Sequence, residues 1–452
     1  MTDVAVIGAG SSGLAVLDAL ARHGTEAVAF ERGSRIGGMW RYGNDSGMSA
    51  AYASLRTNVS RRRMQYPNHP MPASYGDFPS HADMTAYLES YASECDLRDR
   101  VVVGTTVQRL EPAPSDSGWL LHLDDGTTRR HRHVVVATGV FWSPRLPDHR
   151  GDFGGELTHS NAYRTPDPYT GRRVLVVGAG QSAAEIATEL SAVADRCFLS
   201  VRTPTHVVPR RITGEPYDIG DVEPYNRMPW AWLNHVVARR VRSELGPLPP
   251  QWPVPRRRIL EGVPIVSSDL IPAVRSGAVT VTPALQRLGG RRADFADGSS
   301  QRVDAVVLAT GYRIDLPFLD PGLLAAQGRR LPLYRRIVPP GLPGIFLAGF
   351  VDAPGGLLPV VETQAAWISA VVSGRLDLPT RDLMWGAIRR SERRTRQRFP
   401  GEPPDSIRCD PHAYRRLLRS DLAEVALVRR VLHPRRADPI DHGSQVSGCL
   451  PR

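Results

Sequence analysis

Two glycine-rich turns are the parts of this 452-residue sequence best suited to bind a ligand. The first spans Gly8 to Gly13 and the second Gly178 to Ala183, and each follows a short apolar run and precedes a helical pattern. Such a turn lets the backbone approach a pyrophosphate, whose oxygens accept hydrogen bonds from the N–H groups at the helix N-terminus. Each turn therefore predicts a dinucleotide-binding fold. Ala183 replaces the third glycine of the second turn, a change that the pattern allows.

A charged residue near the end of the following strand distinguishes the two turns. Glu31 ends the strand predicted at residues 27–30, where an acid accepts hydrogen bonds from both ribose hydroxyls and repels a 2′-phosphate. The first turn is thus predicted to bind FAD or NAD. Arg202 lies at the matching place after the second turn, where a guanidinium can bind a 2′-phosphate bidentately. The second turn is thus predicted to prefer NADPH, and the alternative is that Arg202 only caps a strand.

Between the turns, Phe153, Gly155, His159 and Tyr163 fit the spacing F-x-G-x-x-x-H-x-x-x-Y. This pattern resembles the fingerprint of the class B flavoprotein monooxygenases, which include flavin-containing, N-hydroxylating and Baeyer-Villiger enzymes. That family carries the fingerprint at the same place, between two dinucleotide turns. As a lone histidine, His159 is expected to position the linker and the cofactor rather than to transfer protons.

Other segments extend the resemblance. Residues 35–40 resemble the family segment that crosses over the flavin, which favours FAD at the first turn; a core tryptophan after an ordinary turn is the alternative. Residues 52–66 contain S-L-x-T-N-x-S, and the resemblance implies that Asn58 faces the reactive edge of the flavin, although a loop asparagine can also satisfy backbone groups. The two Ala-Thr-Gly turns, at residues 137–139 and 309–311, and the segment from residue 344 to Gln364 also resemble segments of the family. The expected cofactor-contacting residues are Gly8, Gly10, Ser12, Gly13, Glu31, Gly38, Trp40, Thr138, Gly139, Gly178, Gly180, Gln181, Ser182, Arg202, Thr310, Gly311, Gly349 and Gln364.

The resemblance implies an α/β chain with two Rossmann-like, three-layer domains in a glutathione-reductase-like arrangement. An FAD-binding domain is expected over residues 1–150 and 301–430, the second part including the C-terminal helices. An NADPH-binding domain is expected over residues 165–300, with an insertion at 204–262, and a flexible tail at 436–452. The insertion is predicted to form a lid or substrate pocket, or else a dimer surface, which leaves a homodimer open.

The resemblance also implies the chemistry. NADPH would reduce FAD, and the reduced flavin would add O2 at its C4a carbon, while oxidised NADP stays bound and shields the adduct. The protein would exclude water and hold the adduct with donors such as Asn58. The hydroperoxide attacks amine nitrogen or sulfur, whereas its anion attacks ketones. Tyr163 stands where the Baeyer-Villiger fingerprint usually has tryptophan, so N- or S-oxygenation of a small molecule is favoured. A Baeyer-Villiger reaction and an NADPH oxidoreductase without oxygenation are the alternatives.

The charge and the cysteine spacing of the sequence argue against several other functions. The net charge of +11 comes from arginine alone, since the sequence has no lysine, and acidic residues are interspersed with the basic ones. Without a recognition motif, nucleic-acid binding is disfavoured. The four cysteines, Cys95, Cys197, Cys409 and Cys449, form no C-x-x-C pair, which argues against a zinc ribbon, a metal site and a flavin disulfide reductase; the fingerprint also argues against a ferredoxin-type reductase. A non-enzymatic nucleotide sensor is the last alternative, and the intact glycines argue against it.

No signal peptide and no apolar run of the roughly 18 residues needed to span a membrane is found. A cytoplasmic protein without a membrane anchor is therefore expected.

Overall fold

The computed structural model describes residues 3–114, 118–148, 151–218, 230–320, 322–323, 331–401 and 406–432. The chain divides into two compact units. The first unit comprises residues 1–49, 61–140 and 315–452, and the second comprises residues 50–60 and 141–314. The segment 50–60 thus belongs to the second unit although its neighbours on both sides belong to the first. The predicted tail at 436–452 lies outside the described residues.

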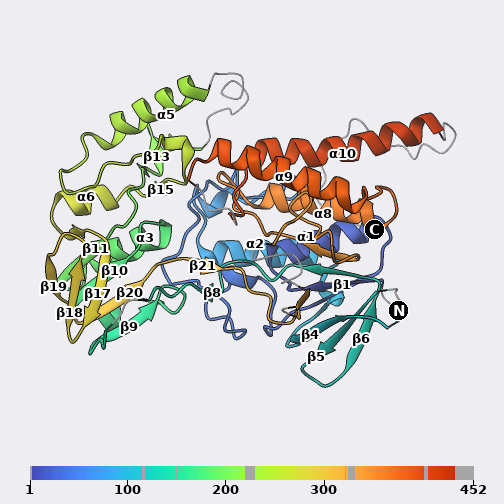
Figure 1. Ribbon diagram of the computed structural model, residues 1–452, viewed down its shortest axis with the longest axis horizontal. Helices are drawn as coiled ribbons and strands as arrows, with labels where there is room; N and C mark the ends of the chain where they lie inside the picture. Colours follow the sequence, from blue (N-terminus) through green and yellow to red (C-terminus); the bar gives the residue numbers. More distant parts are fainter. Residues whose placement is uncertain are drawn as a thin grey trace. The chain divides into compact units, whose positions relative to one another are not determined.

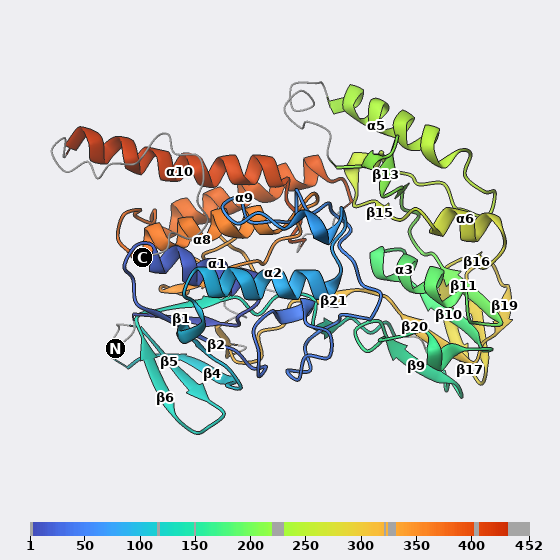
Figure 2. The same cartoon turned by 180° about the vertical axis from the view of Figure 1, so that it is seen from behind.

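The first unit is built on a parallel five-stranded sheet (Figure 1). Its central strands are buried on both faces, which explains their nearly continuous apolar runs in the sequence. Helix α1 (Ser11–Ala21) packs against α8 (Leu358–Val372), so segments from the two ends of the chain lie side by side (Figures 1 and 2). In spatial order the strands are β22 (Ile345–Leu347), β7 (His133–Val136), β1 (Val4–Ile7), β2 (Ala27–Phe30) and β3 (Val101–Val102).

Helix α2 (His81–Glu94) shows how local sequence sets the first unit's helices. Ser80 and Asp83 form a reciprocal capping box at its start, which satisfies free backbone donors. Its buried face consists of Met84, Tyr87, Leu88, Tyr91 and Ala92, so these residues are core. Helices α9 (Arg381–Arg398) and α10 (Pro411–Leu432) complete the unit, and α10 packs on α8.

An antiparallel meander of three strands also belongs to the first unit. It consists of β4 (Val107–Pro112), β5 (Trp119–Leu123) and β6 (Thr128–His131). The apolar pattern over residues 101–107 suits one strand of this meander, but the structure divides it between two sheets. Val101 and Val102 instead pair in parallel with β2, and the meander begins at Val107. A glycine at position 104, with φ of +64°, separates the two strands.

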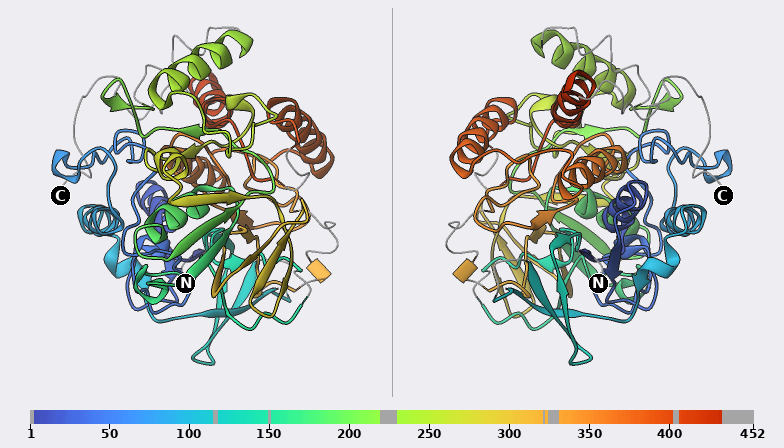
Figure 3. Two further views of the ribbon diagram at one scale, coloured as in Figure 1. Left: turned by 90° about the vertical axis from the view of Figure 1, so that its left-hand side faces the viewer. Right: turned by 90° about the vertical axis from the view of Figure 1, so that its right-hand side faces the viewer.

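The second unit also has a parallel five-stranded sheet, covered on both faces (Figure 3). Alternate residues of its central strand enter opposite cores: Val174 and Val176 pack with α3 (Gln181–Leu190) and α6 (Leu270–Arg275), and Leu175 packs with the antiparallel strands. The sheet contains β16 (Val279–Thr282), β11 (Arg196–Ser200), β10 (Arg173–Val177), β20 (Ala305–Leu308) and β9 (Glu156–His159); the antiparallel strands are β17 (Leu285–Gly289), β18 (Arg292–Phe295) and β19 (Ser300–Arg302).

The insertion in the second unit has a small core of its own, formed by Val208, Val241 and Ile259. Its described elements are β12 (Val207–Val208), β13 (Arg211–Ile212), β14 (Glu215–Pro216), α5 (Trp230–Leu245) and η5 (Ile259–Glu261), and β12 pairs with β15 (Ile265–Val266). Short elements elsewhere are η1 (Gly38–Trp40), η2 (Ala73–Tyr75), η3 (Arg98–Arg100), η4 (Asp167–Tyr169), β8 (Ser143–Pro144) and β21 (Tyr312–Arg313).

Candidate functional site

Both glycine-rich turns lie at the carboxyl end of a central parallel strand, where each leads into a helix. Helix α1 has Gly10 at its N-cap and α3 has Gly180, and neither cap has a side chain that could satisfy the free N–H groups. These N–H groups and the positive end of the helix dipole are suited to bind phosphate. The structure therefore provides two similar anion-binding turns, one in each unit.

Some of the predicted glycines are required by the fold itself. A Cβ at Gly8 would lie 2.8 Å from the Ala137 carbonyl oxygen, and a Cβ at Gly13 would overlap the carbonyl of Gly8. The second turn repeats this tight approach, because a Cβ at Gly178 would overlap the Ala309 carbonyl. Each turn is thus pressed against the Ala-Thr-Gly turn of its own unit.

Gly10 and Gly180 have no such structural requirement. At Gly10 the backbone is extended, and an added Cβ would lie 3.6 Å from the nearest atom, an ordinary contact. At Gly180 φ is −110°, and nothing lies within 4 Å of an added Cβ. Because glycine is entropically costly in the folded state, we attribute both positions to a ligand that approaches the backbone. This observation fits a dinucleotide at each turn.

Replacing Gly180 with alanine is expected to leave the protein's stability unchanged but to raise the apparent KM for NADPH by about 10-fold, since only the ligand needs that space (about 1.4 kcal/mol per factor of ten). Thermal unfolding and steady-state kinetics would check both parts. Gly262→Ala is the matched control, because Gly262 also has negative φ and no atom within 4 Å of an added Cβ. An unchanged KM in Gly180→Ala would contradict a ligand role for this glycine.

Glu31 is buried at the mouth of the first turn. Its carboxylate accepts hydrogen bonds from the N–H of Ala9, at 2.7 Å, and from the N–H of Gly33, at 2.8 Å. Burial raises the pKa of Glu31, and the two backbone donors act in the opposite direction. A carboxylate has about four lone-pair sites, so it retains acceptor capacity for ribose hydroxyls while it fixes the turn.

The Ala-Thr-Gly turn after β7 provides an independent sign of a bound group. The hydroxyl oxygen of Thr138 is buried and has no hydrogen-bond partner. A buried polar atom without a partner is rare in a folded protein and needs an explanation. A Cβ at Gly8 would lie 3.5 Å from the Thr138 Cα, so Thr138 lies beside the first turn. A dinucleotide bound at that turn would explain the unpartnered hydroxyl. Gly139 follows with a φ of +76°.

Gly38 and Trp40 lie in η1, beside the first turn. A Cβ at Gly38, where φ is +55°, would lie 3.0 Å from the Cα of Gly10, so the backbone of this segment lies against the phosphate-binding turn. Trp40 is half-buried, and its carbonyl accepts a hydrogen bond from Thr85 at 3.0 Å. The segment from 35 to 40 therefore lies against the first turn.

The side chain of Gln364, which is among the expected cofactor-contacting residues, is bound on both sides by protein. It is fully buried, its Oε1 accepts the Gly349 N–H at 2.9 Å, and its Nε2 donates to the Tyr414 hydroxyl at 2.8 Å. A Cβ at Gly349, where φ is +80°, would overlap the hydroxyl of Ser12. Gln364 thus holds the Gly349 backbone against the first turn.

In the second turn the Gln181 amide is also engaged by protein. It exchanges hydrogen bonds with both backbone groups of Val266, at 2.8 and 2.9 Å, and donates to Glu185 at 2.7 Å. Ser182 is half-buried at the start of α3, so its backbone N–H is one of those that have no hydrogen-bond partner within the helix. The contribution of Gln181 to a ligand would therefore come from its backbone N–H.

Arg202 lies two residues beyond β11 and is exposed. Among the described residues it takes part in no ion pair or hydrogen bond. Its guanidinium is therefore available to a 2′-phosphate, and no hydrogen bond or ion pair with a described residue supports the alternative that it caps the strand.

Arg202→Ala is expected to raise the apparent KM for NADPH by about 10- to 100-fold, which corresponds to a charge-assisted hydrogen bond of about 1.5–3 kcal/mol. The KM for NADH should change little, because NADH lacks the 2′-phosphate. Steady-state kinetics with both cofactors would measure this, and Arg196→Ala at the other, exposed end of β11 is the control. Equal effects on NADPH and NADH would remove the assigned role.

Thr310 and Gly311 form the corresponding turn after β20. The Thr310 hydroxyl donates to the Arg145 carbonyl at 2.6 Å, and the Arg145 N–H donates to the Gly311 carbonyl at 2.9 Å. Gly311 has a φ of +84°. The hydroxyl of Thr310, unlike that of Thr138, is thus already paired with protein.

The F-x-G-x-x-x-H-x-x-x-Y residues build the edge of the second unit's sheet. A Cβ at Gly155 would lie 2.7 Å from the Phe153 ring and 2.5 Å from the Asp304 carbonyl. Strand β9 follows and pairs with β20. The Tyr163 hydroxyl donates to Glu189 of α3 at 2.7 Å. These contacts hold the segment from Phe153 to Tyr163 against the sheet and against α3 of the second unit.

His159 ends β9 and is buried. Its Nδ1 accepts the Asn161 N–H at 3.1 Å, so its Nε2 carries the proton and donates to the Gly311 carbonyl, also at 3.1 Å. Burial lowers the pKa of His159, which favours this neutral form. A neutral imidazole that holds a backbone carbonyl positions the turn and has no free proton to transfer.

Asn58 lies on the segment 50–60, which belongs to the second unit. A buried network of hydrogen bonds anchors that segment. Arg210 donates to the Thr57 carbonyl and to Glu185 Oε1, both at 2.7 Å. The Tyr52 hydroxyl donates to the other oxygen of Glu185. This network was not predictable from residue spacing, and the one sign of Glu185 in the sequence is an acid within the alanine-rich start of α3.

The side chain of Asn58 itself is half-buried, and its amide forms no hydrogen bond with any residue that the structure describes. The hydroxyls of Thr57 and Ser60, on either side, are buried without partners. The network therefore fixes a backbone on which an amide remains free to bind a ligand.

Two general features complete the description. Across the described residues, no group of three or more His, Cys, Asp or Glu side chains could hold a metal ion. In the same part of the chain, none of the helices has the length and apolar character to cross a membrane.

Comparison with known proteins gives a consistent result. A family model described as flavin-binding monooxygenase-like matches residues 1–419. Dimethylaniline monooxygenase (N-oxide-forming) 4 of Mus musculus is 32% identical over 408 residues, covering 83% of this chain and 70% of the relative. The structure of S-allyl-L-cysteine S-oxygenase from Allium sativum has a TM-score of 0.68 at 23% identity, covering 96% of this chain and 94% of that one. Cyclohexanone monooxygenase from Rhodococcus sp. Phi1, bound to NADP+, has a TM-score of 0.70 at 19% identity, covering 93% and 97%.

Proposed function

Because the chain belongs to the flavin-binding monooxygenase-like family, we propose that it transfers one oxygen atom from O2 to the nitrogen or sulfur of a small molecule. The family predicted from the sequence motifs is confirmed, and so is the α/β class with Rossmann-like folds. The protein is an oxidoreductase with FAD and NADPH as cofactors.

We assign FAD to the first turn and NADPH to the second. The buried carboxylate of Glu31 supports a cofactor without a 2′-phosphate at the first turn, and the exposed Arg202 supports one with a 2′-phosphate at the second. The unpartnered hydroxyl of Thr138 adds support for a ligand at the first turn.

The observation that carries the oxygenase proposal is the free amide of Asn58 on its anchored segment. Bound FAD, reduced by NADPH, supplies the activation of O2. This chain contributes a donor and an acceptor at Asn58, fixed by the bond from Arg210 to the Thr57 carbonyl. A preorganised donor of this kind stabilises developing charge without reorganising during the reaction.

The choice of nitrogen or sulfur over a ketone rests on Tyr163 and on the relatives. The Tyr163 hydroxyl donates to Glu189 at 2.7 Å, a bond made by the residue that replaces the tryptophan of the Baeyer-Villiger fingerprint. The names of the murine relative and of the Allium protein describe N-oxide formation and S-oxygenation. The likeness to cyclohexanone monooxygenase is one of fold, and a Baeyer-Villiger reaction is the second candidate.

Isotope labelling tests the proposal. The FAD-loaded protein would be supplied with NADPH, 18O2 and one of three probes: thioanisole, N,N-dimethylaniline or cyclohexanone. We expect 18O in the sulfoxide or the N-oxide. A labelled lactone without the other products would favour the Baeyer-Villiger alternative. NADPH oxidation that yields only hydrogen peroxide with all three probes would favour an oxidoreductase without oxygenation.

The remaining sequence-based expectations stay proposals. We propose that the partners are O2 and a small-molecule substrate rather than a nucleic acid or a membrane, that the protein is cytoplasmic, and that the insertion covers the substrate or forms a homodimer surface. Cys197 and Cys409 are free and buried.

A further inference from the structure

A chain of hydrogen bonds in the second unit runs from the second glycine-rich turn to the segment that carries Asn58. At the turn, the Gln181 amide donates to Glu185 Oε1 at 2.7 Å. The same carboxylate oxygen accepts a hydrogen bond from Arg210, also at 2.7 Å, and this guanidinium donates to the Thr57 carbonyl at 2.7 Å. Three hydrogen bonds therefore connect Gln181 with the residue that precedes Asn58.

Glu185 is the residue at which these bonds meet. Its second oxygen accepts the hydroxyl of Tyr52, which also belongs to the segment 50–60. Burial raises the pKa of this carboxyl, and the bonds from Tyr52, Arg210 and Gln181 act in the opposite direction. The buried carboxylate is thus stabilised by donors from both the segment and the turn. Because bonds in such a network polarise one another, a change at one donor affects the others.

The insertion holds Asn58 from both sides. Arg210 binds the carbonyl of the preceding residue, and the Asp218 carboxylate accepts the Ser60 N–H at 2.7 Å. The Arg210 carbonyl accepts the Tyr217 N–H at 3.0 Å, so the hairpin of β13 and β14 joins the two clamping residues. Part of the insertion thus positions the segment 50–60.

A second route, through the backbone, connects this hairpin with the turn. Strand β12 ends two residues before Arg210 and pairs in parallel with β15. Both backbone groups of Val266 in β15 exchange hydrogen bonds with the Gln181 amide, at 2.8 and 2.9 Å. The Arg210 N–H also donates to the Ser268 hydroxyl at 3.1 Å. The side chain of Gln181 therefore takes part in both routes.

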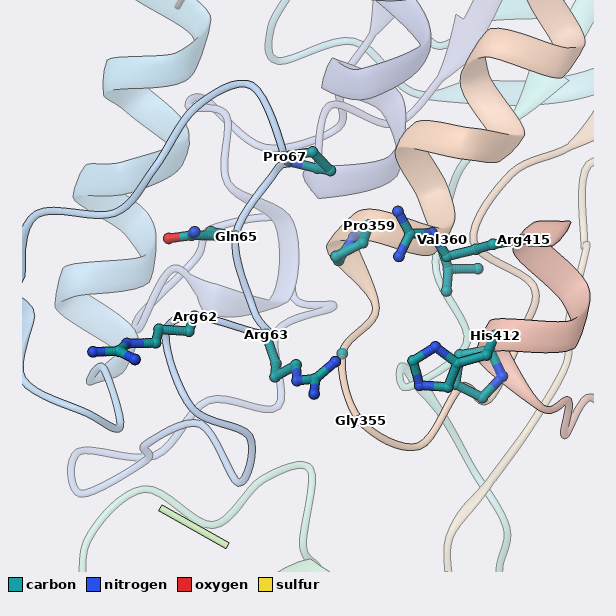
Figure 4. A pocket seen from close by; sticks show the side chains of 11 residues that line it. Arg62, Arg63, Gln65, Pro67, Gly355, Pro359, Val360, His412 and Arg415 are labelled. Atoms are coloured by element: carbon teal, nitrogen blue, oxygen red, sulfur yellow. The ribbon is translucent and has the colours of Figure 1, made fainter. Parts of the chain in front are cut away.

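A pocket in the first unit belongs to the flavin region and adds no separate ligand site. It has a volume of about 230 Å³, and residues within 62–67, 355–360 and 411–415 line it (Figure 4). Residues 62–66 fall in the stretch that resembles the family's flavin segment. Val361 of α8 and Ser12 both lie within 4 Å of a Cβ added at Gly349, so the start of α8 borders the first turn.

We propose that Gln181 and Glu185 are positioning residues that couple NADP(H) at the second turn to the segment that carries Asn58. The backbone N–H of Gln181, at the start of α3, is suited to bind the cofactor, whereas its side chain holds Glu185. A ligand that restrains this backbone also restrains the side chain, and it thereby stabilises the bonds that hold segment 50–60.

The coupling is reciprocal, because a segment that stabilises bound NADP(H) is stabilised by it by the same factor. The Asn58 amide is thus held most firmly while the cofactor is bound. The inference rests on the proposed function, since it describes how the cofactor prepares the same site.

Hydrogen–deuterium exchange of the FAD-loaded protein, with and without NADP+, would test the coupling. Saturating NADP+ should slow exchange about 5-fold in peptides that cover residues 54–60, the low end of ordinary coupling between sites. In Gln181→Ala, which keeps the backbone N–H, NADP+ should still slow exchange at residues 178–183 but no longer at 54–60. Gln181→Met, which keeps the length of the side chain without its hydrogen bonds, should behave in the same way.

Two results would overturn the coupling. If NADP+ slows exchange at 54–60 equally in wild type and both variants, the cofactor acts on the segment without Gln181. If NADP+ slows exchange at 178–183 in the wild type but not at 54–60, the segment is independent of the cofactor. No effect at 178–183 would overturn the placement of NADPH at the second turn, and the coupling with it.

Binding gives a second measurement. By linkage, calorimetry should show the Kd for NADP+ rising about 5-fold in Gln181→Ala. Thr188→Ala is the matched control, because it also removes a side-chain hydrogen bond from α3, that of the Thr188 hydroxyl to the Ala184 carbonyl at 2.8 Å. It should change neither the Kd nor the exchange at 54–60, and an equal effect of this control would contradict the role of Gln181. Neither measurement needs turnover, so both fail independently of the oxygenation experiment.

Discussion

Replacing Arg210 with methionine is expected to destabilise the protein by about 3 kcal/mol, the low end of the range for removing one partner of a buried ion pair. The side chains of Arg210 and Glu185 are only 21% and 14% exposed, and their atoms lie 2.7 Å apart. Without the guanidinium, Glu185 keeps a hydrogen bond from Tyr52 and one from Gln181 but loses its positive partner. Chemical denaturation at several pH values would measure the loss.

The pH dependence of this loss has a defined sign. Burial raises the pKa of Glu185, and Arg210 opposes that rise, so removing Arg210 raises the pKa further. An acid whose pKa is higher in the folded state than in the unfolded state costs no stability below the unfolded-state pKa. The cost grows as the pH rises above that value and is complete above the folded-state pKa. The destabilisation by Arg210→Met should therefore be larger at pH 8 than at pH 5.

Two comparisons isolate the ion pair. Arg211→Met changes the adjacent, exposed arginine and should cost far less, within about 1 kcal/mol. In a Glu185→Gln background, Arg210→Met should also cost less, because no carboxylate is then left without its cation. If Arg210→Met costs the same in both backgrounds, the ion pair is not what stabilises this segment.

The same substitution should impair function. Arg210 also donates to the Thr57 carbonyl, so its loss frees the backbone that carries Asn58. We expect less oxygenated product per NADPH consumed, together with the lower stability. The two effects share one cause, and a variant of Asn58 itself is needed to separate them.

The parts of the site that sequence could predict are those in which neighbouring residues determine the geometry. Gly8, Gly13 and Gly178 are required because each meets a backbone carbonyl, either a few residues away or in the turn after the adjoining strand. The buried face of α2 follows equally from spacing along one helix. The family fingerprint was recognisable for the same reason, since its residues lie within one edge strand and its flanking turns.

The parts that sequence could not predict depend on partners far apart in the chain. Glu185 lies 133 residues from Tyr52, and Gln364 lies 50 residues from Tyr414. Which side chains meet at such separations depends on how the strands are ordered, and spacing does not encode that order. The assignment of residues 50–60 to the second unit arises in the same way, from long-range contacts of Tyr52 and Thr57. The pairing of Val101 and Val102 with β2 is likewise not predictable, because a short apolar run does not identify its partner strand.

Replacing Asn58 with leucine is expected to reduce oxygenated product per NADPH consumed by about 10-fold or more, since removing one preorganised donor can slow a reaction by about 100- to 1,000-fold. The electrons from NADPH should then appear as hydrogen peroxide. Product, peroxide and NADPH consumption would be measured together with thioanisole as the probe. Anaerobic reduction of the flavin by NADPH should keep its rate, because the second turn and Arg202 are unchanged.

Stability separates this variant from Arg210→Met. The Asn58 amide makes no hydrogen bond with a described residue, so Asn58→Leu breaks no hydrogen bond in that part of the chain and should leave the free energy of unfolding within about 0.5 kcal/mol. Asn58→Asp keeps the shape and an acceptor but loses the N–H donor, and it should uncouple the reaction as well. If the aspartate variant stays coupled, the amide acts as an acceptor only. If the leucine variant stays coupled, Asn58 has no part in the oxygen chemistry, and the anchored segment would serve the fold alone.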